Sequence, residues 1–125
     1  MQLYIIKHKM RKMKDLNVIF ITLDGLRQDR LNLMPNLSSI SEKGLFFSNM
    51  ISVSPYTFTS IPSTFCGVYP SVNGINCYYS MFRFKKEKCK TLSQYFKEAG
   101  YYTYADVLND CILPNVGFDD MKLHT

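Results

Sequence analysis

A short stretch of the chain is crowded with hydroxyl side chains, namely Thr57, Thr59, Ser60, Ser63 and Thr64. Such clusters commonly mark a loop or the capped start of a helix. Here a polar loop opens a helix predicted over residues 58–65. The free N–H groups of its first turn would favour a bound tetrahedral anion. A hydroxyl at that turn, beside a metal that lowers its pKa, suits phosphoryl transfer as a nucleophile.

A carboxylate in the same half of the chain could bind a cation. Asp24 directly follows residues 17–23, Asn-Val-Ile-Phe-Ile-Thr-Leu. In parallel sheets ligands bind beyond the carboxyl ends of the strands, and Mg²⁺, Ca²⁺ or Zn²⁺ accept a carboxylate oxygen there. An Asp before Gly is also an ordinary turn former, so position alone leaves both interpretations open.

The elements that must position these residues alternate between strand and helix. Residues 17–23 form an apolar, β-branched run typical of a strand buried on both faces. Asn36 could cap a helix running to Lys43, with Leu37, Ile40 and Ser41 facing inward. Gly44 is then predicted to end that helix in the left-handed conformation, and residues 45–53 to form a second strand.

The same pattern of helix, glycine and strand recurs later in the chain. Residues 91–99 predict a helix with Leu92, Tyr95, Phe96 and Ala99 on one side. Gly100 ends this helix, and residues 101–107 predict a strand. Repeated units of helix, glycine and aromatic strand after an initial strand indicate an α/β fold with right-handed crossovers.

Composition and charge narrow the class of protein. The 125 residues suit one domain, and nine Tyr and nine Phe exclude a largely disordered chain. The net charge of +5 comes from the first 14 residues, since basic and acidic residues balance from Asp15 onward. The leader carries Lys7, Lys9, Arg11, Lys12 and Lys14. The folded body therefore has no basic excess, and no nucleic-acid partner is expected.

Neither an export signal nor a membrane span is recognisable in the sequence, so a cytoplasmic location is the default expectation. Four cysteines, Cys66, Cys77, Cys89 and Cys111, lack the C-x-x-C spacing of zinc ribbons. They are expected to be free, buried thiols.

Five segments, taken in order, resemble the alkaline phosphatase and sulfatase superfamily. Asn17-Val-Ile-Phe-Ile-Thr-Leu-Asp-Gly-Leu-Arg-Gln-Asp29 resembles its opening strand and L-D-x-L-R-x-D pattern. Residues 34–49, 57–74, 92–104 and 117–119 resemble its Pro-Asn-Leu helix, its nucleophile segment, its Leu-x-x-Tyr-Leu-Lys-Glu-Ala-Gly-Tyr segment and its Gly-Phe-Asp. The resemblance implies an alkaline-phosphatase-like α/β fold, with a mostly parallel sheet flanked by helices and incomplete at the C-terminus.

The resemblance also implies roles for two residues. Asp24 corresponds to the family's metal-binding aspartate on the first strand. The family's nucleophile precedes a conserved glycine by ten positions, and counting back from Gly67 gives Thr57 as nucleophile and second metal ligand. The implied cofactor is a divalent ion (Zn, Mn, Mg or Ca), and the implied substrate is a phosphate or sulfate ester.

Several residues depart from the family pattern. Thr57 stands where sulfatases carry a Cys or Ser that becomes formylglycine, which favours a resemblance to phosphoethanolamine and phosphoglycerol transferases. Gly25 replaces a second acidic residue, and Asn73 stands where a His is common. His8 and His124, the two histidines, lie outside matching motifs, so the remaining metal ligands are absent from this chain. The chain alone is therefore expected to be inactive and poorly soluble.

Three hypotheses follow for a basic leader over residues 1–16 and a domain over residues 17–125. The first is the N-terminal part of a metal-dependent hydrolase or transferase that forms a covalent Thr57 intermediate. The second is a sulfatase-like sulfuric ester hydrolase. The third is a non-catalytic α/β interaction module.

Overall fold

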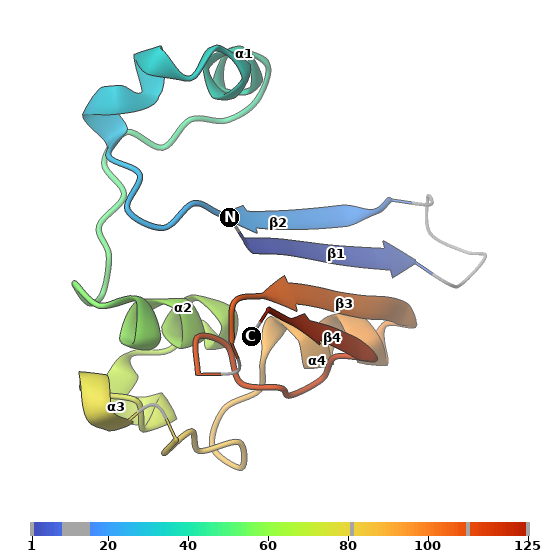
Figure 1. Ribbon diagram of the computed structural model, residues 1–125. Helices are drawn as coiled ribbons and strands as arrows, with labels where there is room; N and C mark the ends of the chain where they lie inside the picture. The colour runs from blue at the N-terminus through green and yellow to red at the C-terminus, as the bar shows by residue number, and fades with distance from the viewer. Residues whose placement is uncertain (1, 9–15, 81, 110, 125) are drawn as a thin grey trace.

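A four-stranded sheet forms the centre of the molecule, in the strand order β2-β1-β3-β4 (Figure 1). The computed structural model describes residues 2–8, 16–80, 82–109 and 111–124, with side chains from residue 16 onward. Among the described residues, no helix is both long and apolar enough to cross a membrane.

Three of the four strands point in the same direction. β1 (Gln2–His8) runs antiparallel to β2 (Val18–Thr22) and to β3 (Tyr101–Val107), and β4 (Asp120–Leu123) runs parallel to β3. Strands β2, β3 and β4 therefore end at the same edge of the sheet. The predicted α/β class with a mostly parallel sheet is confirmed, with one strand of opposite direction between β2 and β3.

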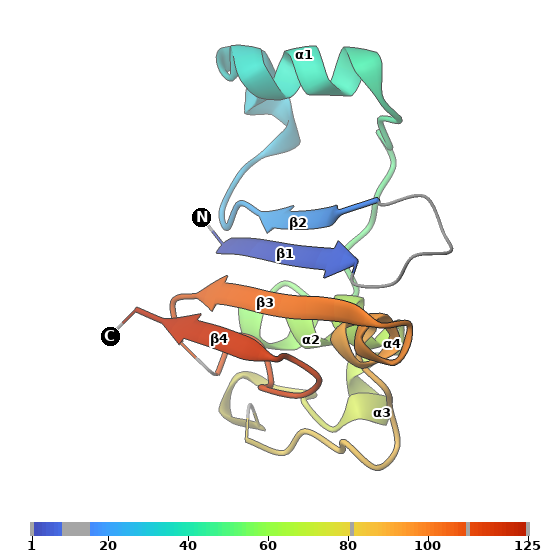
Figure 2. The same cartoon turned by 90° about the vertical axis from the view of Figure 1, so that its right-hand side faces the viewer.

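The core lies between the sheet and two helices, α2 (Thr57–Cys66) and α4 (Leu92–Glu98). Figure 2 shows both helices behind β3. Buried Phe65 of α2 packs with Ala105, Val107 and Leu113. Its ring also meets that of Phe20 edge to face, with the centroids 5.2 Å apart. This packing fixes α2 against the sheet.

The second half of the chain follows the sequence prediction closely. Thr91 caps α4: its hydroxyl accepts from the Gln94 N–H, while the Gln94 side chain accepts from the Thr91 N–H. Gly100, with φ of 87°, reverses the chain into β3, which spans Tyr101–Val107 as predicted. The helix predicted from its apolar spacing, α4, thus follows the Thr91 cap and ends before Gly100.

The predicted strand over residues 45–53 is wrong. The segment is an irregular connection between α1 (Pro35–Lys43) and α2, and Leu45 and Ile51 are almost fully exposed. The Ser52 hydroxyl donates to the Ser54 carbonyl and accepts from the Ser54 N–H. Serine side chains that bond nearby backbone groups compete in this way with a strand ladder.

Other details of the first half also differ from prediction. Ile19 and Ile21 of β2 are exposed, since α2 and α4 cover one face of the sheet and β2 is not buried on both faces. Ile40 is 66% exposed rather than inward-facing. Gly44 is extended, with φ of −125°, and not left-handed. α1 lies beyond the β2 edge, apart from the sheet, in both views (Figures 1 and 2), so its apolar side chains have no core to enter.

Short elements complete the fold: η1 (Gln28–Leu33), α3 (Pro70–Asn73) and η2 (Tyr78–Ser80). The four cysteines carry thiols rather than disulfides, as predicted. Their predicted burial holds for Cys89 only, because Cys77 is exposed and Cys66 and Cys111 are half-buried.

Candidate active site

Thr57 is the first residue of α2, the helix start that the hydroxyl cluster predicted. The chain enters the helix through Tyr56, whose backbone is extended, with φ of −112° and ψ of 137°. The Ser54 hydroxyl bonds the hydroxyl of buried Thr59 and accepts from the Tyr56 N–H. Serine and threonine side chains thus fix the entry angle, as polar residues at helix starts commonly do.

Asp24 lies in the turn that follows β2. Gly25, at φ of 73°, takes the left-handed conformation, and the Leu26 N–H donates to the Leu23 carbonyl at 3.4 Å. The turn sends the chain away from the sheet and leaves the Asp24 side chain exposed at its carboxyl edge. This is the edge at which parallel strands ordinarily bind ligands.

The structure brings the two predicted site residues together. The Thr57 hydroxyl donates to Asp24 Oδ1 at 3.0 Å, although the residues are 33 positions apart in the chain. One comes from the end of a strand and the other from the start of a helix packed on the sheet. The contact orients the Thr57 oxygen and holds it beside a carboxylate.

The backbone at this point adds positive potential. Thr57 and Phe58 begin α2, so their N–H groups have no carbonyl of a preceding turn to bond. The N–H groups of Thr59 and Ser60, one step further, already donate to the Tyr56 carbonyl. A helix start of this kind favours an anion with the shape of phosphate or sulfate.

The metal-ligand roles predicted for Asp24 and Thr57 require further ligands. Asp24 and Thr57 offer two oxygen donors, the type that hard divalent cations prefer. Within the described residues, no group of three or more His, Cys, Asp or Glu side chains is placed to hold a metal ion. Catalytic metals take about three or more protein ligands. The two residues therefore fit two positions in a coordination shell and leave the others to further ligands.

Other charged residues at this edge pair among themselves. The Arg27 guanidinium makes two bonds of 2.9 Å to the Asp29 carboxylate and lowers the pKa of that carboxyl. The His124 ring pairs with Asp106, which lowers the pKa of the Asp106 carboxyl. His124 thus contacts β3 and not Asp24, in agreement with its place outside the matching motifs.

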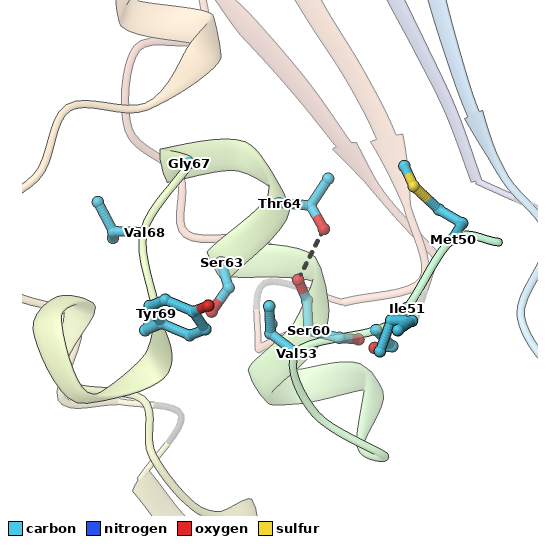
Figure 3. A pocket seen from close by; sticks show the side chains of 10 residues that line it. Met50, Ile51, Val53, Ser60, Ser63, Thr64, Gly67, Val68 and Tyr69 are labelled. Carbon is cyan, nitrogen blue, oxygen red and sulfur yellow. Dashed lines mark hydrogen bonds between the residues drawn. The ribbon is translucent and has the colours of Figure 1, made fainter. Parts of the chain in front are cut away.

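A pocket of about 610 Å³ opens along the flank of α2, next to the Thr57 end (Figure 3). One wall is the irregular segment 50–53, and the opposite wall is formed by Ser60, Ser63 and Thr64 of α2 and by residues 67–69. Sequence analysis missed this pocket because it assigned the apolar side chains of segment 45–53 to a strand. The spacing of Ser60 and Thr64, three and seven positions after Thr57, was the available signal, since it places them on one helix face.

Asn73 has a structural role beside this pocket. It is fully buried, its amide donates to the Ser63 hydroxyl at 3.0 Å, and its side-chain oxygen accepts from the Ile75 N–H at 2.8 Å. Its backbone carbonyl accepts from the Lys85 N–H at 2.8 Å. Asn73 therefore joins α2 to the following loop and supports the pocket wall from behind.

Comparison with known proteins agrees with the geometry. The sulfatase family model matches residues 16–122. Human iduronate 2-sulfatase is 31% identical over 94 residues, and the mouse enzyme is 29% identical over 94 residues. In each case the match covers 70% of this chain and 17% of the relative, so the chain spans a small part of those enzymes. No solved structure matches the chain.

Proposed function

The chain belongs to the sulfatase family of hydrolases, and from that premise we propose that Thr57 is the nucleophile of a phosphate or sulfate ester hydrolase or transferase. The contact between the Thr57 hydroxyl and the Asp24 carboxylate, 3.0 Å, carries the proposal. Family membership and an oriented hydroxyl at a helix start support the same residue independently.

The proposed reaction begins with the ester bound at the start of α2. The anionic head of the ester accepts hydrogen bonds from the N–H groups of Thr57 and Phe58. The Thr57 oxygen attacks the central phosphorus or sulfur, and its proton leaves toward Asp24. A bond from that atom to the Thr57 oxygen forms and the ester bond breaks. The departing alkoxide takes a proton from water, and Asp24 returns the Thr57 proton to water, so that a neutral alcohol leaves. Water or a second alcohol then releases the Thr57 ester.

Asp24 and Thr57 are also proposed as two ligands of a divalent cation. A cation at this position would lower the pKa of the Thr57 hydroxyl and neutralise charge on the ester. Because the described residues provide two ligands, water would complete the coordination shell of an added cation. We therefore expect this chain to form the Thr57 ester slowly at millimolar metal and to release it too slowly for detectable turnover.

Two observations point to different esters as the substrate. The relatives are named iduronate 2-sulfatases, which favours a sulfate ester. Thr57 is an unmodified β-branched alcohol that cannot become the aldehyde formylglycine, which favours a phosphate ester. We propose the phosphate ester, because Thr57 is the residue placed to react.

The test looks for the covalent intermediate, which requires the first half-reaction only. The chain is incubated with p-nitrophenyl phosphate and millimolar Mn²⁺ and quenched in acid, and its peptides are mapped by mass spectrometry. A phosphoryl group is expected on Thr57. It should disappear in Thr57→Ala and fall at least roughly tenfold in Asp24→Asn, because a neutral amide is a much weaker proton acceptor and cation ligand than a carboxylate.

Ser71→Ala is the matched control, since it removes an exposed hydroxyl from α3, away from Thr57 and from the residues that line the pocket. It should leave the Thr57 adduct unchanged. Labelling by p-nitrophenyl sulfate and not by the phosphate would shift the proposal to a sulfate ester. A chain that stays unlabelled with both, or carries label on another hydroxyl, would favour the non-catalytic module. Rapid release of p-nitrophenol would contradict the expected lack of turnover.

A further inference from the structure

The pocket on the flank of α2 is lined by residues on the helix face that also carries Thr57. Ser60, in its wall, lies three residues after Thr57, about 4.5 Å along a helix axis. The two residues are also joined by a bond of 3.5 Å from the Ser60 hydroxyl to the Thr57 carbonyl. At about 610 Å³ the pocket has the size of a small-molecule site. An ester reacting at Thr57 could therefore extend its organic group into this space.

The walls of the pocket are uncharged. Met50, Ile51, Val53 and Val68 provide aliphatic surface, and Tyr69 provides an aromatic face (Figure 3). None of the described residues that line it is an acid, a lysine, an arginine or a histidine. A carboxylate entering this pocket would lose water without gaining an opposite charge.

The hydroxyl groups in the wall act as acceptors. The Ser63 hydroxyl donates to the Thr59 carbonyl at 2.8 Å, and the Thr64 hydroxyl donates to the Ser60 carbonyl at 2.9 Å. Ser60 donates likewise to the carbonyl of Thr57. The Ser63 oxygen already accepts from the Asn73 amide. A hydroxyl has one proton and two lone pairs, so the oxygens of Ser60 and Thr64 offer lone pairs to O–H or N–H donors of a ligand.

The dipole of α2 also favours a ligand that brings hydrogen-bond donors to the pocket. The pocket runs from Ser60 toward Gly67 and Val68, past the C-terminal end of α2, which carries negative potential. The positive end lies at Thr57. A molecule bound across both ends would place an anionic head at the start of the helix and an uncharged, donor-bearing group along its flank.

We propose that this pocket binds the organic group of the ester and selects an uncharged alcohol or phenol bearing further hydroxyl groups, in preference to a carboxylated one. The proposal rests on Thr57 as the reacting residue for its connection to catalysis. The selectivity itself belongs to the pocket walls and requires no chemistry at Thr57.

Two probes of similar size separate the alternatives. 4-Hydroxybenzyl alcohol is uncharged and carries two hydroxyls, whereas 4-hydroxybenzoate replaces one of them by a carboxylate. Each is titrated into the ¹⁵N-labelled chain, and the amide shifts of Ser60, Thr64 and Val68 are followed. The alcohol is expected to shift these amides and to bind at least roughly tenfold more tightly than the benzoate.

Val53→Lys should gain affinity for the benzoate, a result that a misfolded variant would not give. Val53 is 47% exposed and lines the pocket, so a lysine there fits and offers the missing positive charge. This variant should bind the benzoate at least as well as the alcohol. Ile40→Lys, the control, adds the same charge on exposed α1 and should keep the wild-type preference.

Equal binding of both probes, shifts confined to other residues, or an unchanged preference in Val53→Lys would overturn the proposal. The experiment contains no ester, so its result is independent of the Thr57 adduct. If the pocket selects the alcohol but no Thr57 adduct forms, the proposed function is overturned and the pocket proposal stands. An adduct without selectivity would do the reverse.

Discussion

Asp119 is the carboxylate most firmly held by its surroundings. Lys97 Nζ lies 2.8 Å from its Oδ1, and its Oδ2 accepts from the Thr103 N–H at 2.9 Å and the Thr103 hydroxyl at 3.0 Å. These donors, Lys97 first, lower the pKa of the Asp119 carboxyl from 3.8 to about 2. The residue thereby joins α4, β3 and the loop before β4.

Acid should remove this contribution to stability. Because the folded pKa is lowered, the charged carboxylate stabilises the fold above pH 3.8 and loses that effect as the pH falls toward about 2. Asp119→Asn should cost about 1 kcal/mol at pH 7, since the side chain is partly screened by water. The difference from wild type should disappear near pH 2. Urea unfolding at both pH values measures it.

Asp120→Asn serves as the control for this experiment, because Asp120 is the exposed neighbour at the start of β4. It should leave the free energy of unfolding within about 0.5 kcal/mol of wild type. An Asp119→Asn variant as stable as wild type at pH 7 would show that the bonds to Thr103 and Lys97 contribute nothing in solution.

Among the elements, the turns that end α2 and α3 offer a matched pair of glycines. Gly67 and Gly74 both have positive φ, 64° and 89°. A Cβ on Gly67 would meet nothing within 4 Å, whereas on Gly74 it would lie 2.4 Å from the Arg83 carbonyl oxygen. An alanine at position 67 would be strained only by its positive φ. An alanine at position 74 would be strained by its positive φ and would also clash with the Arg83 carbonyl oxygen.

Alanine at these two positions should therefore have unequal effects. Gly67→Ala should cost about 1 kcal/mol through backbone strain. Gly74→Ala should cost about 2 kcal/mol or more, since the loop carrying Arg83 and Lys85 must move away from Asn73. Thermal unfolding of the two variants compares them directly. Equal losses would mean that the loop yields without resistance.

Elements with local signals could be predicted from sequence, and elements that depend on distant partners could not. The capping pair at Thr91 and the glycine at position 100 act within a few residues. β3 was therefore predicted at its observed bounds, and the helix predicted over residues 91–99 is α4, Leu92–Glu98. Residues 45–53 have a similar apolar pattern. A strand also needs a neighbouring strand to pair with, and the local sequence does not show whether one is present. The same limit explains Ile19 and Ile21, whose burial requires an element on the second face.

The candidate site divides in the same way. The carboxyl-edge rule made Asp24 a candidate, the hydroxyl cluster gave five candidates, and the family resemblance selected Thr57 among them. The structure places the Thr57 hydroxyl 3.0 Å from Asp24 Oδ1. The pocket could not be predicted, because its wall at residues 50–53 depends on where an irregular segment passes. Irregular backbone has no periodic signal in sequence.

For the whole molecule, the position of β1 matters most. β1 lies between β2 and β3, whereas the family match begins at residue 16, after β1. Ile5 pairs with Ile19 on one side and Tyr104 on the other. A proline at position 5 removes the N–H that this residue offers to one neighbouring strand and should cost about 1–3 kcal/mol, whereas Ile5→Val keeps the backbone intact.

Circular dichroism melts and light scattering test this prediction. Ile5→Pro should lower the melting temperature and promote aggregation, because the edges of β2 and β3 lose their shared partner. Ile5→Val should melt close to wild type. If Ile5→Pro also melts like wild type, the strand contributes little to the sheet.

The place of β1 in the sheet also sets an order of events during synthesis. Leu3 pairs with Ile21, made shortly after it, and with Asp106, made long after both. On a ribosome that adds about 5–20 residues per second, β1 waits on the order of ten seconds for β3. A two-stranded hairpin is marginally stable alone, so the nascent chain exposes an unfinished sheet for that interval. The first strand synthesised can thus be among the last to reach its native pairing.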